Sequence, residues 1–291
     1  MKSPFHERAL IADGQALEHT ARPPAAEPPQ GRHDNGDGWE KVPPQFRAAD
    51  GVLPSPWEER FGPLRQGTVD DLVVVGQLGQ SIDGRIATMS GHSKYINGSA
   101  GLDHLHRLRA VVDAVLVGVG TAVADNPQLT VRRVAGPSPA RIVLDPKGRL
   151  PPQARLLAAD GVRRLVVTAE GAQPSPPGTE DIRLPAPGGE MAPAAILRAL
   201  YERGFRRILI EGGAHTVSRF IAAGCLDRLH VVVAPIIIGA GPSGVTLKPI
   251  ARADEALRCS PMRAHLIGEE VLFDCDLTAQ RVVVGRAKKS T

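Results

Sequence analysis

The sequence predicts an α/β protein in which a sheet is covered by helices on both faces. From Leu72 onward, short apolar runs alternate with helical segments, the pattern of a sheet packed between two helix layers. The 291 residues, 42% of them hydrophobic, are enough to bury a large core. Two apolar runs close the chain on either side of Gly268-Glu269-Glu270, which predicts a hairpin rather than another parallel unit.

Residues 1–70 are predicted to form a proline-rich arm ahead of the main domain, because paired prolines interrupt a polar stretch without sustained periodicity. The main domain is expected to span residues 71–285, followed by a basic tail, 286–291. A core that begins at Leu72 is expected to stay folded when residues up to Arg65 are deleted. Large apolar side chains usually cover a surface, so we expect part of the arm to pack on the main domain or on a partner subunit. The arm residues of this kind are Trp39, Phe46, Trp57 and Phe61.

The first half of the main domain contains four short apolar runs that predict buried strands. Between the first two, residues 102–110 predict a helix, with polar positions that include His104, His106, Arg107 and Arg109. The Pro151-Pro152 connection separates the last two. These four strands are expected at residues 72–78, 114–118, 141–144 and 164–167.

In the second half, glycines mark where the predicted helices end. Residues 192–203 predict a helix that stops at Gly204, and residues 214–223 predict another that ends at Gly224. The apolar run 229–238 is about half as long as a membrane span, which takes roughly 20 residues, so it predicts a core strand. The other strands are expected at residues 207–210, 263–267 and 271–276.

Charge and composition favour a pocket for an anionic small molecule over a nucleic-acid or membrane surface. The formal charge of +4 comes from arginines scattered along the chain, and aromatic residues, which stacked bases need, make up 3%. The start of the sequence lacks the apolar core of a secretory signal, so a cytoplasmic location is expected. We expect neither a nucleic-acid partner nor a membrane partner.

Metal and nucleophile chemistry is not predicted. Cys225, Cys259 and Cys275 are far apart and odd in number, which indicates buried or partly buried thiols and no disulfide framework or zinc site. The histidines do not show metal-ligand spacing with nearby acids, so no metal is expected. The G-x-S-x-G motif and the P-loop are both missing, which disfavours a hydrolase or kinase.

Two glycine turns follow predicted strands and are candidates for phosphate binding at a helix N-terminus. They are Gly118-Val-Gly-Thr121 and Gly212-Gly213, and two such turns in one sheet favour a dinucleotide, although neither has the G-x-G-x-x-G spacing. The alternative for each is a plain tight turn. Asp125 either accepts from a ribose hydroxyl or fixes an Asx turn before Pro127.

Three further residues carry groups that hold a substrate phosphate, namely Ser93, Arg109 and Arg132. For each arginine the alternative is an ordinary surface position. Glu211 ends a predicted strand, where functional residues of open α/β sheets are found. Its alternative is an exposed acid that favours the helix dipole.

From about Val73 to Asp276 the sequence resembles the pyrimidine reductase of riboflavin biosynthesis, the reductase half of the bifunctional deaminase/reductase. The motifs occur in the same order along most of the chain after the arm. They are Ser81-Ile-Asp83-Gly84-Arg-Ile-Ala87, Leu108-Arg109-Ala110, Asp113-Ala-Val-Leu-Val-Gly118, Gly120-Thr121, Ala124-Asp125-Asn-Pro127-Gln-Leu129-Thr-Val-Arg132, Arg141-Ile-Val-Leu-Asp145, Glu211-Gly-Gly213 and Ala234-Pro235.

The resemblance implies a three-layer fold like that of dihydrofolate reductase, with a mixed central sheet flanked by helices, assembled as a homodimer. It implies NADPH as cofactor and a phosphorylated pyrimidine as small-molecule substrate. The substrate would lie against Gln77, Ser93, Arg109, Leu129 and Arg132, with Glu211 as the catalytic residue that hydrogen-bonds the pyrimidine or the polarised sugar. The cofactor would lie along Gly79, Tyr95, Thr121, Asp125, Gly213, Ala214, His215 and Thr216.

The activity that the resemblance implies is hydride transfer to the sugar carbon of 5-amino-6-(5-phosphoribosylamino)uracil, taken as an open-chain imine, which gives the ribityl product. Four departures bear on the substrate. The deaminase half is absent, Gln77 replaces a lysine usual in the family, Tyr95 stands where tryptophan is common, and Pro146 replaces a small hydroxyl residue. The alternatives are a reductase of the same fold acting on another pyrimidine or a pterin, and a non-catalytic nucleotide-binding protein.

Overall fold

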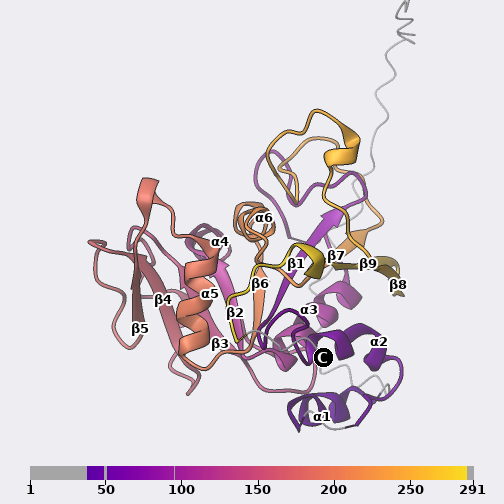
Figure 1. Ribbon diagram of the computed structural model, residues 1–291, viewed down its shortest axis with the longest axis horizontal. Helices are drawn as coiled ribbons and strands as arrows, with labels where there is room; N and C mark the ends of the chain where they lie inside the picture. Colours follow the sequence, from indigo (N-terminus) through magenta and orange to yellow (C-terminus); the bar gives the residue numbers. More distant parts are fainter. Residues whose placement is uncertain (1–37, 49–50, 95, 287–291) are drawn as a thin grey trace, which may run out of the picture.

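The structure is a computed structural model and describes residues 38–48, 51–94 and 96–286. Nine strands form one mixed sheet in this part of the chain (Figure 1). In chain order they are β1 (Val73–Ser81), β2 (Ala114–Gly118), β3 (Ala140–Leu144), β4 (Arg164–Ala169), β5 (Glu180–Leu184), β6 (Arg207–Glu211), β7 (Arg228–Ala234), β8 (Met262–Ile267) and β9 (Glu270–Asp276). Across the sheet the order is β5-β4-β3-β2-β6-β1-β7-β9-β8.

The order of the strands reverses between β2 and β6. After β2 the chain moves outward through β3, β4 and β5, and after β6 it moves to the other side through β7. The strands from β5 to β7 are parallel, whereas β9 runs antiparallel to both β7 and β8. Ligands of open α/β sheets bind beyond the carboxyl ends of the strands at such a reversal.

Helices cover both faces of the sheet, as the sequence predicted. On one face, α5 (Pro193–Glu202) and α6 (Ala214–Ala222) pack on alternate strand residues such as Leu116 and Ile210. On the other face, α3 (Ser99–Val111) and α4 (Val119–Asp125) pack on the residues between them, such as Val115 and Leu209. Because successive side chains of each strand point to opposite faces, the sheet has one hydrophobic core on each face.

Helix α3 differs from the sequence prediction, because the positions expected to be polar are buried. His104, His106, Arg107 and Arg109 each keep less than a tenth of their surface exposed. The reason is that α3 is covered twice, by the sheet on one side and by arm residues on the other. Two arm rings lie against Arg107, with its guanidinium carbon 5.5 Å from the Trp39 ring centroid and 4.5 Å from that of Trp57.

Part of the arm packs on the main domain. Two short helices, α1 (Val42–Ala48) and α2 (Trp57–Phe61), lie together beside α3 (Figure 1). Their apolar side chains join the same core as β1 and α3. The buried arm residues include the large apolar side chains of Trp39, Val42, Phe46, Leu53, Trp57, Phe61 and Leu64. Because these side chains are buried in the core, we now expect a deletion up to Arg65 to destabilise the main domain, contrary to the expectation drawn from the sequence.

Three other elements differ from the sequence predictions. The strand expected at residues 229–238 ends at Ala234, because Pro235 has no N–H to continue the ladder, and Ile237 is left 74% exposed. Helix α4 and strand β5 were not predicted; α4 has seven residues, and β5 exposes polar residues at three of its five positions.

The three cysteines are free and buried or partly buried, as predicted.

We expect Phe61→Ala in the full-length chain to lower the free energy of unfolding by about 3–5 kcal/mol, the usual cost of truncating a buried phenylalanine. Phe61 is fully buried between the arm and α3. Val52→Ala is the matched control, since Val52 is 76% exposed and its truncation should change stability by less than about 0.5 kcal/mol. Urea unfolding measures both, and a wild-type midpoint for Phe61→Ala would contradict an arm that belongs to the core.

Candidate active site

A cavity of about 860 Å³ lies at the carboxyl ends of β1, β2, β3 and β6. It therefore opens at the reversal of strand order. Its walls come from the ends of these strands, the first turns of α4 and α6, the N-terminal half of α3 and several loops. The lining includes Gln77, Leu78, Gly79, Ile86, Ser93, Ile96, Asn97, Leu102, Leu105, Gly118–Thr121, Asp125, Leu144, Pro146, Lys147, Arg149, Glu190, Met191, Gly212–Thr216, Arg219 and Pro242.

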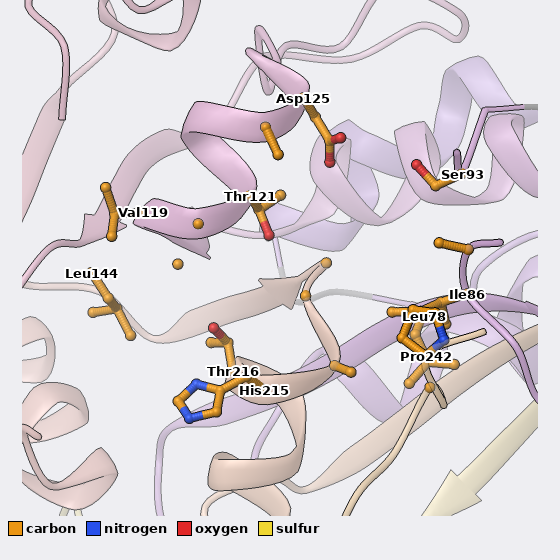
Figure 2. Close-up of a pocket in the computed structure, with 18 of the residues that line it drawn as sticks. Leu78, Ile86, Ser93, Val119, Thr121, Asp125, Leu144, His215, Thr216 and Pro242 are labelled. Atoms are coloured by element: carbon orange, nitrogen blue, oxygen red, sulfur yellow. The ribbon is translucent and has the colours of Figure 1, made fainter. Parts of the chain in front are cut away.

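Two glycine turns meet in the middle of this cavity. A Cβ added at Gly213 would lie 2.8 Å from Thr121 Oγ1, and one added at Gly118 would lie 2.7 Å from Thr216 Oγ1. Each turn thus faces the threonine of the other helix, and the two hydroxyls lie across the cavity from one another in Figure 2. Gly213 also has a φ of +54°, which disfavours other residues. The glycines are required for the close approach of α4 and α6.

The turn before α6 presents a helix N-terminus to the cavity. Ala214 and His215 begin this helix and line the wall, with His215 exposed and Thr216 buried. His215 Nε2 is 3.6 Å from Glu190 Oε1, and Arg219 Nε is 3.4 Å from Glu190 Oε2. A helix N-terminus with a threonine hydroxyl beside it suits a phosphate oxygen.

Asp125 and Ser93 lie at the other side of the cavity. Asp125 ends α4 and Ser93 stands in the loop before α3, and Figure 2 shows their side chains on the same side of the opening. Partial burial raises the pKa of the Asp125 carboxyl, and the charge of Lys94 acts in the opposite direction. Both positions carry groups that could hydrogen-bond a ribose or a phosphate.

The wall at Gly79 is held by a carboxylate from the other end of the chain. A side chain at Gly79 would collide with Asn97, so this strand position needs glycine. The Asn97 amide donates to Glu270 Oε1 over 2.8 Å, and the N–H groups of Gly98 and Gly101 donate to the same carboxylate. Glu270 therefore fixes the loop before α3 and accepts from the first turn of that helix.

Two cations at the far end of the cavity were missed by the sequence analysis. Lys147 and Arg149 follow β3 directly and are exposed, and the loop that carries them is tied down because the Leu150 N–H donates to Asp145 Oδ2 over 2.7 Å. Pro146 was noted above as a departure from the family, but a pattern in the same segment could have predicted these cations: basic residues just after a strand of the parallel sheet.

Arg109 and Glu211 form a buried pair next to the cavity and are not part of its lining. Arg109 Nε lies 2.6 Å from Glu211 Oε1, and Arg109 Nη2 lies 2.6 Å from Oε2. The third guanidinium nitrogen, Nη1, donates to the carbonyl of Thr130 over 3.1 Å. Both carboxylate oxygens accept from Arg109, and because Glu211 is buried outside the cavity lining, a direct contact with a substrate would require a rearrangement around this pair. Gln77 is paired with Glu211 in the sheet and does line the cavity.

Arg132 and Leu129 lie in the loop between α4 and β3. Arg132 is exposed, its N–H donates to His106 Nδ1 over 3.1 Å, and partial burial together with Arg109 lowers its pKa. His106 is buried beside these arginines, and burial with their charge lowers its pKa to about 2. Leu129 has a φ of +56°, and its side chain is buried in the core rather than exposed to the cavity.

The structure thus brings together most of the predicted site residues. Those that line the cavity are Gln77, Gly79, Ser93, Thr121, Asp125, Gly213, Ala214, His215 and Thr216. Those outside its lining are Arg109, Leu129, Arg132 and Glu211. Tyr95 lies outside the described residues. The roles assigned to all of them remain predictions.

Fold and cavity define a three-layer α/β protein with a pocket at the reversal of strand order. The model of the RibD C-terminal domain matches residues 73–273. The chain therefore belongs to the RibD C-terminal domain family, a family of reductases, and the predicted resemblance to riboflavin-pathway pyrimidine reductases and the predicted fold are confirmed.

Three known proteins illustrate the likeness. A 2,5-diamino-6-ribosylamino-4(3H)-pyrimidinone 5′-phosphate reductase of Methanothermobacter thermautotrophicus is 32% identical over 215 residues, 69% of this chain and 96% of the relative. The riboflavin biosynthesis protein RibD of Mycobacterium tuberculosis is 32% identical over 204 residues, and the match covers 69% of this chain and 53% of that protein. The crystal structure of a deaminase/5-amino-6-(5-phosphoribosylamino)uracil reductase of Thermotoga maritima superposes with a TM-score of 0.61 at 30% identity, over 70% of this chain and 56% of that one.

This chain therefore spans about half the length of its RibD relatives. Within the described residues, no group of three or more His, Cys, Asp or Glu side chains is placed to hold a metal ion. In the same part of the chain, no helix has both the length and the apolar character that crossing a membrane requires.

We expect Glu211→Gln to lower the free energy of unfolding by about 3–5 kcal/mol, because it leaves the buried guanidinium of Arg109 without a counter-charge. Glu180→Gln is the control, since Glu180 forms a similar two-point pair with Arg163 in which both side chains are 45% exposed. That change should cost less than about 1 kcal/mol. Chemical denaturation measures the difference, and equal losses would contradict the view that Glu211 stabilises the fold through Arg109.

Proposed function

We propose that this chain is the NADPH-dependent reductase that converts 5-amino-6-(5-phosphoribosylamino)uracil to its ribitylamino product. The observation that carries the proposal is the reciprocal approach of the two glycine turns, each with a threonine hydroxyl facing the other turn. A cavity of about 860 Å³ is large enough for an elongated cofactor beside a small substrate. Membership of the family supports the reductase class, and the residues that line the cavity are the proposed binding groups for the cofactor and the substrate.

The described residues fit a nicotinamide dinucleotide. The first turns of α4 and α6 approach closely because Gly118 and Gly213 carry no Cβ, so two helix N-termini line the same cavity and form a cradle for phosphate oxygens. Thr121 and Thr216 would hold them with their hydroxyls. Lys147 and Arg149, at the far end of the cavity, would pair with a 2′-phosphate. When bound, NADPH supplies the hydride.

The substrate would lie between the cavity and the loop that carries Arg132. Arg132 is exposed beside Arg109, Arg133 and Arg155, and this concentration of positive charge suits the 5′-phosphate. Glu211 acts through Arg109, which it holds against the Thr130 carbonyl and so against the same loop. In this role Glu211 is a positioning residue, and Gln77, one strand away, is the polar group that meets the heterocycle.

A second candidate substrate is favoured by Gln77. A lysine at this position donates hydrogen bonds only, whereas a glutamine amide both donates and accepts. It can therefore accept from a 2-amino group as well as donate to a 2-oxo group. The Methanothermobacter relative is named for a 2,5-diaminopyrimidinone substrate, and this chain covers 96% of it. The 2-amino compound is the alternative substrate that we propose for this site.

We further propose a cytoplasmic homodimer. Three free thiols are typical of a reducing compartment. Strands β7, β9 and β8 share an apolar face whose side chains are only partly buried or exposed, and such a face suits a second copy of the chain. It is formed by Val231, Val233, Ala264, Leu266, Val271 and Phe273. Light scattering on the purified chain measures its mass in solution and would show a monomer if this face stays free.

We expect the purified full-length chain to consume NADPH when given the phosphoribosylamino substrate, and the product to gain two hydrogens in a mass spectrum. The 2,5-diamino compound and a pterin complete the panel. Arg132→Gln should raise KM for the phosphorylated substrate by about tenfold or more, since a charged hydrogen bond contributes about 1.5–3 kcal/mol. Arg252→Gln is the control, because Arg252 pairs with Asp254 on an exposed surface. Turnover of the pterin alone would overturn the proposed substrate class.

NADPH should bind more tightly than NADH. Lys147→Ala should weaken NADPH binding by about tenfold and leave the affinity for NADH unchanged, because the 2′-phosphate is the group that distinguishes the two. Lys248→Ala is the matched control, at an exposed lysine away from the cavity lining. Fluorescence titration measures the affinity of wild type and of each variant for NADPH and for NADH. An equal loss of affinity for both cofactors in Lys147→Ala would place Lys147 elsewhere along the bound molecule.

A further inference from the structure

We propose that the N-terminal segment, Trp39–Ala48, is a built-in clamp that sets the position of the Arg132 loop and so the affinity for the substrate phosphate. The inference rests on the proposed function, because it takes this loop as the phosphate site. The segment precedes residues 73–273, the part that matches the family model, so the clamp lies outside the part of the chain that defines the family.

The Arg132 loop depends on side-chain contacts for its position. It comprises residues 126–139, which are all described and form neither helix nor strand. Its first half is held by α3, through the bond from the Arg132 N–H to His106 Nδ1 and the pair between Arg133 Nε and Asp103 Oδ1 at 2.6 Å. Val131 and Val134 pack on the core shared by α3 and the arm.

The second half of the loop is held by the N-terminal segment. Trp39 Nε1 donates to the carbonyl of Ala135 over 2.8 Å. At the next residue, a Cβ on Gly136 would lie 2.5 Å from Ala110 Cβ and 3.4 Å from Pro43 Cγ. The loop backbone therefore runs between α3 and α1, with no room for a side chain at Gly136.

Trp39 is anchored so that it can hold the loop. It is 4% exposed, and its ring centroid lies 5.1 Å from that of Trp57 and 5.2 Å from that of Phe61. The guanidinium of Arg107, on α3, lies over both tryptophan rings. Since the ring is fixed on one side, its indole N–H has a fixed direction, and the hydrogen bond to Ala135 transmits that position to the loop.

The consequence for binding is specific to the phosphate. Arg132 and Arg133 lie three and two residues before Ala135, so release of the loop at Ala135 affects the segment that carries these guanidinium groups. Arg133 remains tied to Asp103 and Ser99, which leaves Arg132 as the group most affected. The cofactor cradle, formed by the turns at Gly118 and Gly213, has no part in these contacts.

Trp39→Phe tests the clamp in the full-length chain, because it keeps a ring in the core and removes the N–H donor. We expect KM for the phosphorylated substrate to rise about three- to tenfold, as for the loss of one neutral hydrogen bond, with NADPH affinity and kcat little changed. The same substrate without its phosphate should show no difference between wild type and variant. Trp57→Phe is the matched control: the same replacement in the same cluster, at a ring that lies on Arg107 and Arg60.

A second measurement does not depend on the substrate. Amide hydrogen exchange of residues 130–136 should be faster in Trp39→Phe than in wild type or Trp57→Phe. Unchanged exchange there would overturn the clamp. Faster exchange with an unchanged KM for the phosphorylated substrate would overturn the link to the phosphate, and a wild-type chain that turns over no phosphorylated pyrimidine would instead overturn the proposed function. Gly136→Ala, which pushes the loop away from Ala110, should reproduce both effects of Trp39→Phe.

Discussion

The structure depends on the close approach of two helix N-termini at the point where the strand order reverses. Helix α4 follows β2 and helix α6 follows β6, and these strands are neighbours whose helices leave on opposite faces of the sheet. The turns can meet because Gly118 and Gly213 carry no side chain, and any Cβ there would meet a threonine oxygen within 3 Å. The separation of the two helix layers, and with it the width of the cavity, follows from this contact.

Charge burial on α3 is the second constraint. A helix covered on both sides must find partners for its polar residues, since an unpaired buried charge is costly. Arg109 finds Glu211, and Asp103 finds Arg133. His104 Nε2 lies 3.0 Å from His230 Nδ1, and burial with the nearby charges holds the pKa of His104 well below its usual range, so this ring is neutral. The polar side chains of α3 therefore contact β6, β7 and the Arg132 loop. These contacts fix the loop relative to the sheet.

Sequence patterns predicted the strands of the sheet core and the helices with clear apolar periodicity. The family resemblance added site residues, nine of which line one cavity, and local features such as strand ends and glycine turns mark several of them. Glu211 shows where such reasoning stops: its position at a strand end was visible, but its pairing with Arg109, 102 residues earlier, is a tertiary contact. The burial of Arg107 under Trp39 and Trp57 was hidden for the same reason. Lys147 and Arg149 could have been found from their place after a strand.

The arginines beside the cavity concentrate positive charge on one loop. Burial lowers the pKa of Arg132, and Arg109, Arg155 and Arg133 lower it further, while Glu211 acts against them. The Glu211 carboxylate is already paired with Arg109, and the Asp103 carboxylate is paired with Arg133. The exposed Arg132 therefore retains positive charge that its surroundings do not offset. A phosphate dianion would offset it and would relieve the repulsion among the guanidinium groups. The hydrogen bond from Trp39 to Ala135 ties the same loop to the N-terminal segment, and in the proposed clamp this contact keeps the Arg132 guanidinium beside its neighbours.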